Sequence, residues 1–214
     1  MRQLPRLLFF TLLVRPVLFL ILGFNVRHRE RLPVRGPAII VANHNSHLDA
    51  PVLMSLLPLR LLPRIRPVAA ADYFLSNRWL AWFALHIIGI IPLRMGGRQP
   101  KETLLAEIAA ALQNDSIIIL FPEGTRGEPE KFGKFRAGIG VLAEWFPQVP
   151  IHPIYLYGLG KALPRGEILL VPFFCDVFVG TALRGEGGDR RSFMARLDGT
   201  MRRLAEENKT ATWE

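Results

Sequence analysis

A polar segment of seven residues, NHNSHLD, directly follows the apolar run PAIIVA and holds the residue types of a general base. Its His44 and Asp49 would lie about 140° apart on a continuous helix, so they can meet only if the chain turns between them. Ser46 and Asp49 form an S-x-x-D signal, and either residue can cap a following helix. Asp49 would then hold Nδ1 of His44 and leave Nε2 free to take a hydroxyl proton. An isolated H-x4-D also fits a plain structural turn, and we interpret the nearby His47 as structural.

A second polar segment, FPEGTR, follows the apolar run SIIIL and has the residue types of an anion site. Gly124 permits a tight turn or a close approach of the backbone to a ligand, and Arg126 offers a forked donor suited to a phosphate. Glu123 could orient such donors or touch an acceptor hydroxyl, and Thr125 could add a hydrogen bond. Taken alone, the segment also fits a turn with a surface salt bridge.

Several kinds of catalytic site find no support in the sequence. It contains no G-x-S-x-G elbow, no H-E-x-x-H and no cluster of metal ligands, which argues against a covalent acyl-serine and against a bound metal. The single cysteine, Cys175, lies in the apolar run VPFFCDVFV, so we interpret it as a small buried hydrophobe in a chain from a reducing compartment. Direct attack by a substrate hydroxyl, deprotonated by His44, fits the remaining residues best.

The positive charge of the chain is concentrated near its N-terminus. The formal net charge is +9, and the first 66 residues hold ten arginines against two acidic residues, hence a net charge of +8. Such a segment could meet nucleic acid or an anionic membrane. Because the arginines flank an apolar run and are not interleaved with exposed aromatic residues, we expect membrane lipids as partners and no nucleic acid.

The apolar run Leu7–Phe24 is the expected membrane anchor. Arg15 and Pro16 divide it into two arms of about eight residues, roughly 12 Å of helix each, which are too short to cross a bilayer. We therefore favour a bent pair of helices in one leaflet, with Arg15 reaching toward the headgroups, over one spanning helix or a cleaved signal peptide. The arginines of Arg27–Arg35 place the following domain on the cytoplasmic side of the inner (plasma) membrane.

Apolar strands alternate with helical patterns through the rest of the chain, which predicts an α/β domain with a largely buried, mostly parallel sheet flanked by helices. We expect the anchor and basic linker over residues 1–36 and one domain over residues 37–214. Asn77–Ile88 is either a core helix or a second membrane-facing element. The polar clusters NHNSHLD, LRMGGR and PEGTRG each follow an expected strand, so they can converge on one site. Strands are expected at PAIIVA, Val68–Ala71, GIIPLR, SIIILF, PIHPIYLYG and within EILLVPFFCDVFVG, and helices over Lys101–Asn114, Ala137–Phe146 and Ser192–Leu204.

NHNSHLD resembles the N-H-x4-D motif of the lysophosphatidate acyltransferase family of glycerolipid acyltransferases, and FPEGTR is similar to that family's second signature. The two motifs come in the family's order, and GIIPLR and VPIHPI resemble two looser family blocks. The resemblance implies that His44 is the catalytic base and Asp49 its orienting partner. It further implies an acceptor site made by Arg94, Glu123, Gly124, Thr125 and Arg126. Apart from the resemblance, Arg98 could serve as the phosphate partner in place of Arg94. Lys134 and Arg136 fit either helpers for phosphate or the donor's CoA, or a solvated charge run.

The same resemblance implies acyl transfer from acyl-CoA or acyl carrier protein to the free hydroxyl of 1-acyl-glycerol-3-phosphate, which forms phosphatidate. It implies neither a metal nor another cofactor. Two alternatives stay open. The acceptor could be a different lysophospholipid or a lyso-aminolipid, used by the same His/Asp mechanism. From another class, the chain could be an inactive membrane-tethering protein.

Overall fold

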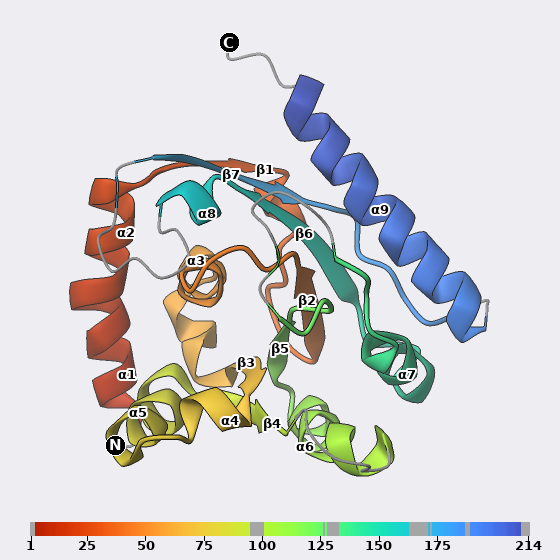
Figure 1. The fold of residues 1–214 in the computed structure, drawn as a ribbon, viewed down its shortest axis with the longest axis horizontal. Coiled ribbons are helices and arrows are strands. Elements are labelled where there is room, and N and C mark those ends of the chain that lie inside the picture. Colours follow the sequence, from red (N-terminus) through yellow and green to blue (C-terminus); the bar gives the residue numbers. More distant parts are fainter. Residues whose placement is uncertain are drawn as a thin grey trace.

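Seven strands form one sheet at the centre of the protein (Figure 1). The computed structural model describes residues 3–94, 101–125, 127, 133–162, 171, 173–186 and 189–210. The strand order is β1-β7-β6-β2-β5-β3-β4, and every neighbouring pair is parallel except β6 and β7. This confirms the predicted α/β domain with a mostly parallel sheet. The strands are β1 Gly23–Arg27, β2 Ala38–Ala42, β3 Ile65–Ala70, β4 Ile91–Leu93, β5 Ile117–Leu120, β6 Ile151–Tyr157 and β7 Phe174–Val179.

Helices cover both faces of the sheet, with α1, α2 and α3 on one side and α6, α7 and α9 on the other (Figure 1). The α-helices are α1 Leu4–Phe9, α2 Arg15–Ile21, α3 Asp49–Leu56, α4 Ala71–Phe74, α5 Arg78–Phe83, α6 Lys101–Gln113, α7 Gly138–Trp145, α8 Leu159–Ala162 and α9 Arg190–Thr210. The remaining helical turns are of π type at η1 Phe10–Val14 and η4 Ala84–Ile88, and of 3-10 type at η2 Arg29–Arg31 and η3 Leu59–Arg64.

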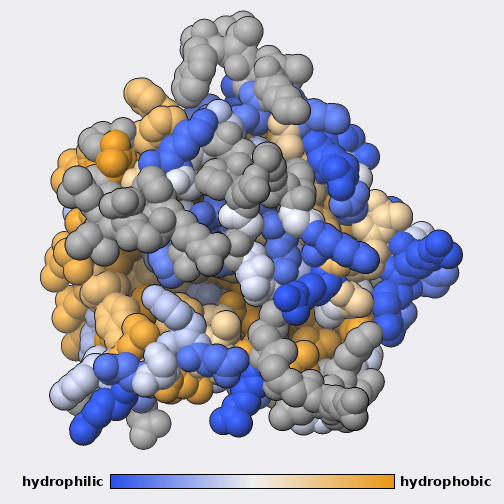
Figure 2. Space-filling model, in the orientation of Figure 1, coloured by the Kyte–Doolittle hydropathy of each residue, from blue (hydrophilic) through white to orange (hydrophobic). Residues whose placement is uncertain are grey.

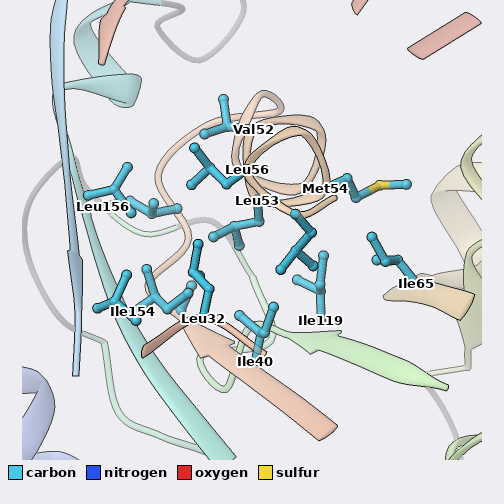
Figure 3. Close-up of a cluster of buried hydrophobic side chains, with 14 of the residues drawn as sticks. Leu32, Ile40, Val52, Leu53, Met54, Leu56, Ile65, Ile119, Ile154 and Leu156 are labelled. Carbon is cyan, nitrogen blue, oxygen red and sulfur yellow. The ribbon is translucent and has the colours of Figure 1, made fainter. Parts of the chain in front are cut away.

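Side chains of the central strands alternate between the two faces of the sheet, so the buried core consists of two clusters, one on each face. Ile40 of β2 and Ile119 of β5 pack against Leu53 of α3 on one face (Figure 3). Ile39 and Ile118, their chain neighbours, join the opposite cluster with α6, α7 and α9. Because both faces are covered, these strands read as continuous apolar runs in the sequence, which explains why PAIIVA and SIIILF predict β2 and β5 well.

The N-terminal apolar run forms a continuous helical segment, so the expected break at Arg15 and Pro16 is wrong. Leu4–Ile21 is long and apolar enough to cross a membrane, by its length and composition. The π turn Phe10–Val14 directly precedes Pro16, which has no N–H to donate to the preceding turn. A widened turn accommodates such a residue without ending the helix.

Arg15 also differs from its expected position, because it points into the protein. Its Nη2 donates to the carbonyl oxygens of Ser55 and Leu57, at the C-terminal end of α3. Arg6 likewise donates to the carbonyl of Ile65, 2.7 Å away. Cations favour the last carbonyls of a helix, so Arg15 ties the apolar helix to α3.

One side of the N-terminal helix remains uncovered, and a second apolar element lies beside it. Phe9 of α1 packs edge-to-face on Phe83 of α5, with ring centroids 5.2 Å apart. Apolar surface gathers on the side of the molecule where α1 and α2 lie (Figure 2). Asn77–Ile88, expected as either a core helix or a membrane-facing element, contributes exposed aromatic rings, and its His86 is exposed and not a core histidine. The exposed large side chains of the two elements are Leu4, Leu7, Leu8, Leu12, Leu13, Val17, Phe19, Leu20, Trp79, Trp82 and Leu85.

Strand β1 was missing from the sequence prediction, which places Gly23–Arg27 in the anchor and basic linker. It pairs in parallel with β7, some 150 residues later in the chain, with Asn25 opposite Asp176. The two side chains share a hydrogen bond of 3.0 Å. The segment that follows the apolar helix is therefore part of the central sheet.

Candidate active site

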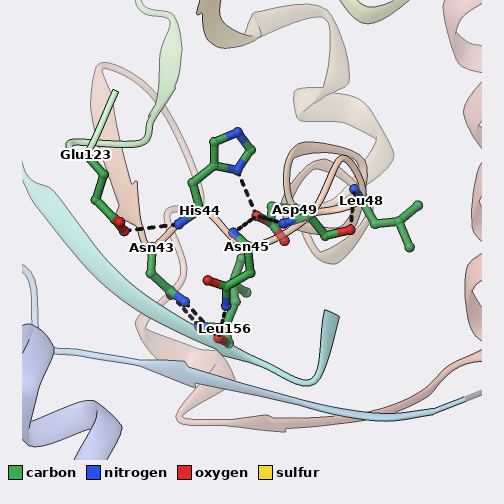
Figure 4. A network of polar contacts seen from close by, with 8 residues as sticks. Asn43, His44, Asn45, Leu48, Asp49, Glu123 and Leu156 are labelled. Atoms are coloured by element: carbon green, nitrogen blue, oxygen red, sulfur yellow. Dashed lines mark hydrogen bonds and ion pairs between the residues drawn. The ribbon is translucent and has the colours of Figure 1, made fainter. Parts of the chain in front are cut away.

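His44 and Asp49 form a hydrogen-bonded pair just beyond the carboxyl end of β2 (Figure 4). The distance between His44 Nδ1 and Asp49 Oδ2 is 2.8 Å. The His44 side chain is 22% exposed, whereas the Asp49 side chain is fully buried. The imidazole stacks on the ring of Phe121, with centroids 4.2 Å apart. With Nδ1 engaged by a buried carboxylate, Nε2 is the nitrogen that is left to exchange a proton.

Asp49 is held by backbone groups that precede it in the chain. Its Oδ2 also accepts hydrogen bonds from the N–H groups of Asn45 and Ser46, at 2.6 and 2.8 Å. Asp49 is the first residue of α3, and Leu48 occupies the N-cap position without a side-chain cap. Ser46 Oγ accepts the N–H of Leu48 at 3.3 Å, so the bonds expected from the S-x-x-D signal form in the turn just before α3 and not at its N-cap residue. The carboxylate folds back over the turn and fixes the loop that carries His44.

Two asparagines fasten the same loop to β6. Asn43 donates to the carbonyl of Leu156 at 2.9 Å, and its amide oxygen accepts from the Leu156 N–H at 2.7 Å. Asn45 donates to the same carbonyl at 3.2 Å (Figure 4). The two bonds of Asn43 imitate a backbone pair and continue the β2–β6 ladder where β2 ends. Sequence reasoning missed this role because Leu156 lies 113 residues from Asn43.

Glu123 connects the second polar segment to the first. Its Oε1 accepts from the His44 N–H at 3.3 Å, and its Oε2 accepts from the Gly133 N–H at 3.0 Å. Burial raises the pKa of the Glu123 carboxyl, and the two backbone hydrogen bonds oppose that rise. The sequence suggests that Glu123 could orient donors or touch an acceptor hydroxyl. In the structure, both of its carboxylate oxygens accept hydrogen bonds from the protein's own backbone.

Three other predicted site residues, Gly124, Thr125 and Arg94, follow strands at the same edge of the sheet. Gly124 adopts a φ of +76°, so the expected tight turn is present, and Thr125 is exposed beside it. Arg94 is exposed just after β4, which is the third strand from β2 in the sheet. Arg126 and Arg98 lie outside the described residues.

Cys175 and His47 lie outside the His44–Asp49 arrangement. Cys175 is buried, as predicted, and burial raises the pKa of its thiol to about 12. His47 is exposed and stacks on Tyr73, with centroids 6.0 Å apart. In the part of the chain that the structure describes, no three His, Cys, Asp or Glu side chains are arranged to hold a metal ion.

Comparison with known proteins places these two motifs in a family. A profile described as "Acyltransferase" matches residues 23–157, which include β1 and both polar segments. The chain belongs to the Acyltransferase family. The matched region begins at β1 and ends at β6, so it contains the strands that carry His44, Glu123 and Leu156.

Named relatives of this acyltransferase come from plants and animals. The chain is 29% identical over 144 residues to a chloroplastic 1-acyl-sn-glycerol-3-phosphate acyltransferase of Arabidopsis thaliana, covering 67% of this chain and 38% of the relative. It is 27% identical over 169 residues to the human 1-acyl-sn-glycerol-3-phosphate acyltransferase alpha, covering 76% of this chain and 56% of the relative. The chain thus spans about two fifths to just over half of these relatives.

A solved structure has the same fold. The crystal structure of the 1-acyl-sn-glycerophosphate acyltransferase PlsC from Thermotoga maritima superposes with a TM-score of 0.79 at 20% identity. The match covers 100% of this chain and 85% of that one, so the N-terminal helix and β1 are included in it.

Proposed function

We propose that this protein transfers a fatty acyl group from an acyl thioester to the free hydroxyl of 1-acyl-glycerol-3-phosphate, which yields phosphatidate. The observation that carries the proposal is the 2.8 Å bond between His44 and the buried Asp49, with the imidazole reaching the surface beside the Glu123 loop. Relatives of the family are named for this reaction. The donor is acyl-CoA or acyl carrier protein, and both present the same thioester to the base.

The reaction needs one proton acceptor and no covalent enzyme intermediate. Nε2 of His44 removes the acceptor's hydroxyl proton as the oxygen attacks the thioester carbonyl, and the carbon–oxygen bond forms. Asp49 holds the tautomer and stabilises the imidazolium that results. The tetrahedral intermediate then collapses, the carbon–sulfur bond breaks, and the thiolate takes the proton from His44. The histidine returns to its neutral form, and the step requires no metal or other cofactor.

The apolar helix provides what a lipid substrate requires. Acceptor and product remain in the bilayer, so a site held at the interface avoids moving their chains through water. The exposed faces of Leu4–Ile21 and of α5 supply the apolar surface. The arginine-rich segment that follows supports a cytoplasmic orientation of the domain, because positively charged segments next to a membrane helix favour that side.

The test is acyl transfer by the purified full chain in mixed micelles, with acyl-CoA and acyl carrier protein donors offered to a panel of lysolipids. We expect a preference for 1-acyl-glycerol-3-phosphate, and a fall in rate of about 10²- to 10⁴-fold in His44→Ala. His86→Ala is the matched control, because His86 is exposed on η4 and bonds only the Trp82 carbonyl among the described residues.

The outcomes separate the alternatives. If another lysophospholipid or a lyso-aminolipid reacts faster, the His/Asp mechanism stands and the acceptor is reassigned. If the parent protein binds vesicles but no donor and acceptor pair reacts, the chain is a membrane-tethering protein and the proposed reaction is wrong.

A further inference from the structure

Arg136 lies directly against Gly124, at the centre of the second polar segment. A Cβ atom placed on Gly124 would be 2.3 Å from Nε of Arg136 and 2.9 Å from its Cζ. A side chain at this position would require the Arg136 guanidinium to move. Gly124 therefore has two functions, because it adopts the positive φ of the turn and leaves room for a guanidinium.

Two further contacts fix Arg136 to the same turn. Its backbone N–H donates to the carbonyl of Pro122 at 2.8 Å, and its Nε donates to the carbonyl of Glu123 at 3.1 Å. The opposite end of Glu123 accepts the N–H of His44. Glu123 thus contacts both His44 and Arg136, and these contacts hold the arginine in place before any substrate binds.

Within the part of the chain that the structure describes, the outer edge of the guanidinium has no partner. Arg136 is exposed, and among the described residues no carboxylate forms an ion pair with it and no acceptor bonds its Nη atoms. A guanidinium that is held at Nε can donate N–H groups from its outer nitrogens to two oxygens of one phosphate.

We propose that Arg136 binds the phosphate of the acceptor lipid, in addition to any contribution from the EGTR segment itself. The assignment rests on the proposed function. In 1-acyl-glycerol-3-phosphate, only two carbons and one ester oxygen lie between the reacting hydroxyl and phosphorus. A group that binds the phosphate must therefore lie near His44, and Arg136 is placed there by Glu123 and Gly124. Phosphates of the donor's coenzyme A have the same chemistry, so the test measures both substrates.

The first experiment compares Arg136→Gln with the parent protein, using 1-acyl-glycerol-3-phosphate and the neutral 1-acylglycerol, which has the same hydroxyl and no phosphate. We expect KM for the phosphorylated acceptor to rise about 10- to 100-fold, with the rate on the neutral acceptor and the KM for acyl-CoA little changed. Arg136→Lys keeps the charge and loses the fork, so it should fall between the two. Arg202→Gln removes an exposed arginine of α9 and is the matched control.

A double-mutant cycle tests the contact with Gly124. Gly124→Ala should raise the same KM, because its methyl group displaces the guanidinium. In an Arg136→Ala background the clash is gone and only the backbone strain remains, so Gly124→Ala should have a clearly smaller effect there than in the parent.

The results that would overturn the assignment are distinct from those that would overturn the reaction. Equal losses on both acceptors, a rise confined to the KM for acyl-CoA, or additive effects in the cycle would each remove Arg136 from the acceptor's phosphate. Absence of activity in the parent protein would instead contradict the proposed function, before any Arg136 variant is compared.

Discussion

At the scale of single residues, Glu123 joins parts of the site that lie far apart in sequence. Its carboxylate accepts N–H groups from His44 and Gly133, and its carbonyl accepts Nε of Arg136. Only a carboxylate can accept at both side-chain oxygens, because an amide replaces one of them with a donor. Burial disfavours the ionised form of this carboxyl and raises its pKa.

The variant Glu123→Gln tests the raised pKa of this carboxyl through the pH dependence of the protein's stability. A carboxyl whose pKa is raised in the folded state contributes stability that is fully present below its unfolded pKa and is lost as pH rises through the folded pKa. The stability advantage of the parent over Glu123→Gln should therefore shrink as pH rises from the ordinary value of 4.5 toward neutrality. Denaturant unfolding in detergent at several pH values measures it, with Glu186→Gln, on an exposed turn, as the control. An advantage that grows with pH would contradict the raised pKa.

At the scale of elements, Arg15 joins the apolar helix to the catalytic domain. Its guanidinium binds carbonyl oxygens at the C-terminal end of α3, and the buried side chains Phe10, Leu18 and Leu22 pack beside it. The charge that appears in the sequence as an interruption of the membrane segment thus caps another helix. A long apolar stem can replace its packing but not its hydrogen bonds.

Arg15→Met should accordingly lower the free energy of unfolding by about 1–2 kcal/mol, because the α3 carbonyls lose their donor and their cation. Leu20→Met is the control, since Leu20 is 85% exposed and no core packing depends on it. Chemical denaturation in the same detergent measures both variants. An unchanged midpoint in Arg15→Met would mean that the apolar helix is held by packing alone.

The sequence predicts the elements whose signal is local. β2 and β5 are continuous apolar runs, and α6 and α9 show helical spacing, so their positions are close to those expected. β1 has no such signal, because GFNVR is short, follows an apolar helix and gains its partner only from β7. The meeting of His44 with Asp49 follows from motif spacing, whereas the contacts of Asn43 with Leu156 and of Gly124 with Arg136 arise only when distant strands assemble.

At the scale of the whole molecule, apolar surface and positive charge occur together. The exposed faces of Leu4–Ile21 and α5 lie side by side, and the first 66 residues hold most of the net charge of +9. Apolar burial favours any bilayer, whereas the arginines favour one with anionic lipids. Added salt screens the attraction between the arginines and anionic lipids but not the burial of apolar surface, so the two contributions to membrane binding can be measured separately.

The full chain should therefore bind vesicles that contain an anionic phospholipid more tightly than neutral ones, and added salt should weaken mainly the anionic preference. Leu12→Glu, on a side chain that is 70% exposed, should reduce binding to both kinds of vesicle. Vesicle flotation at two salt concentrations measures these effects, with Arg202→Glu on α9 as a control for charge alone. Binding that is equal on both vesicles at low salt would contradict a role for the arginines.

Helix α3 has Asp49 at one end and the carbonyls that bind Arg15 near the other. Its eight residues correspond to about 12 Å of rigid rod. The His44–Asp49 pair and the carbonyls that bind Arg15 are therefore separated by a fixed length, which is set by the number of turns in α3. Adding or removing one turn of α3 would change that separation by about 5.4 Å.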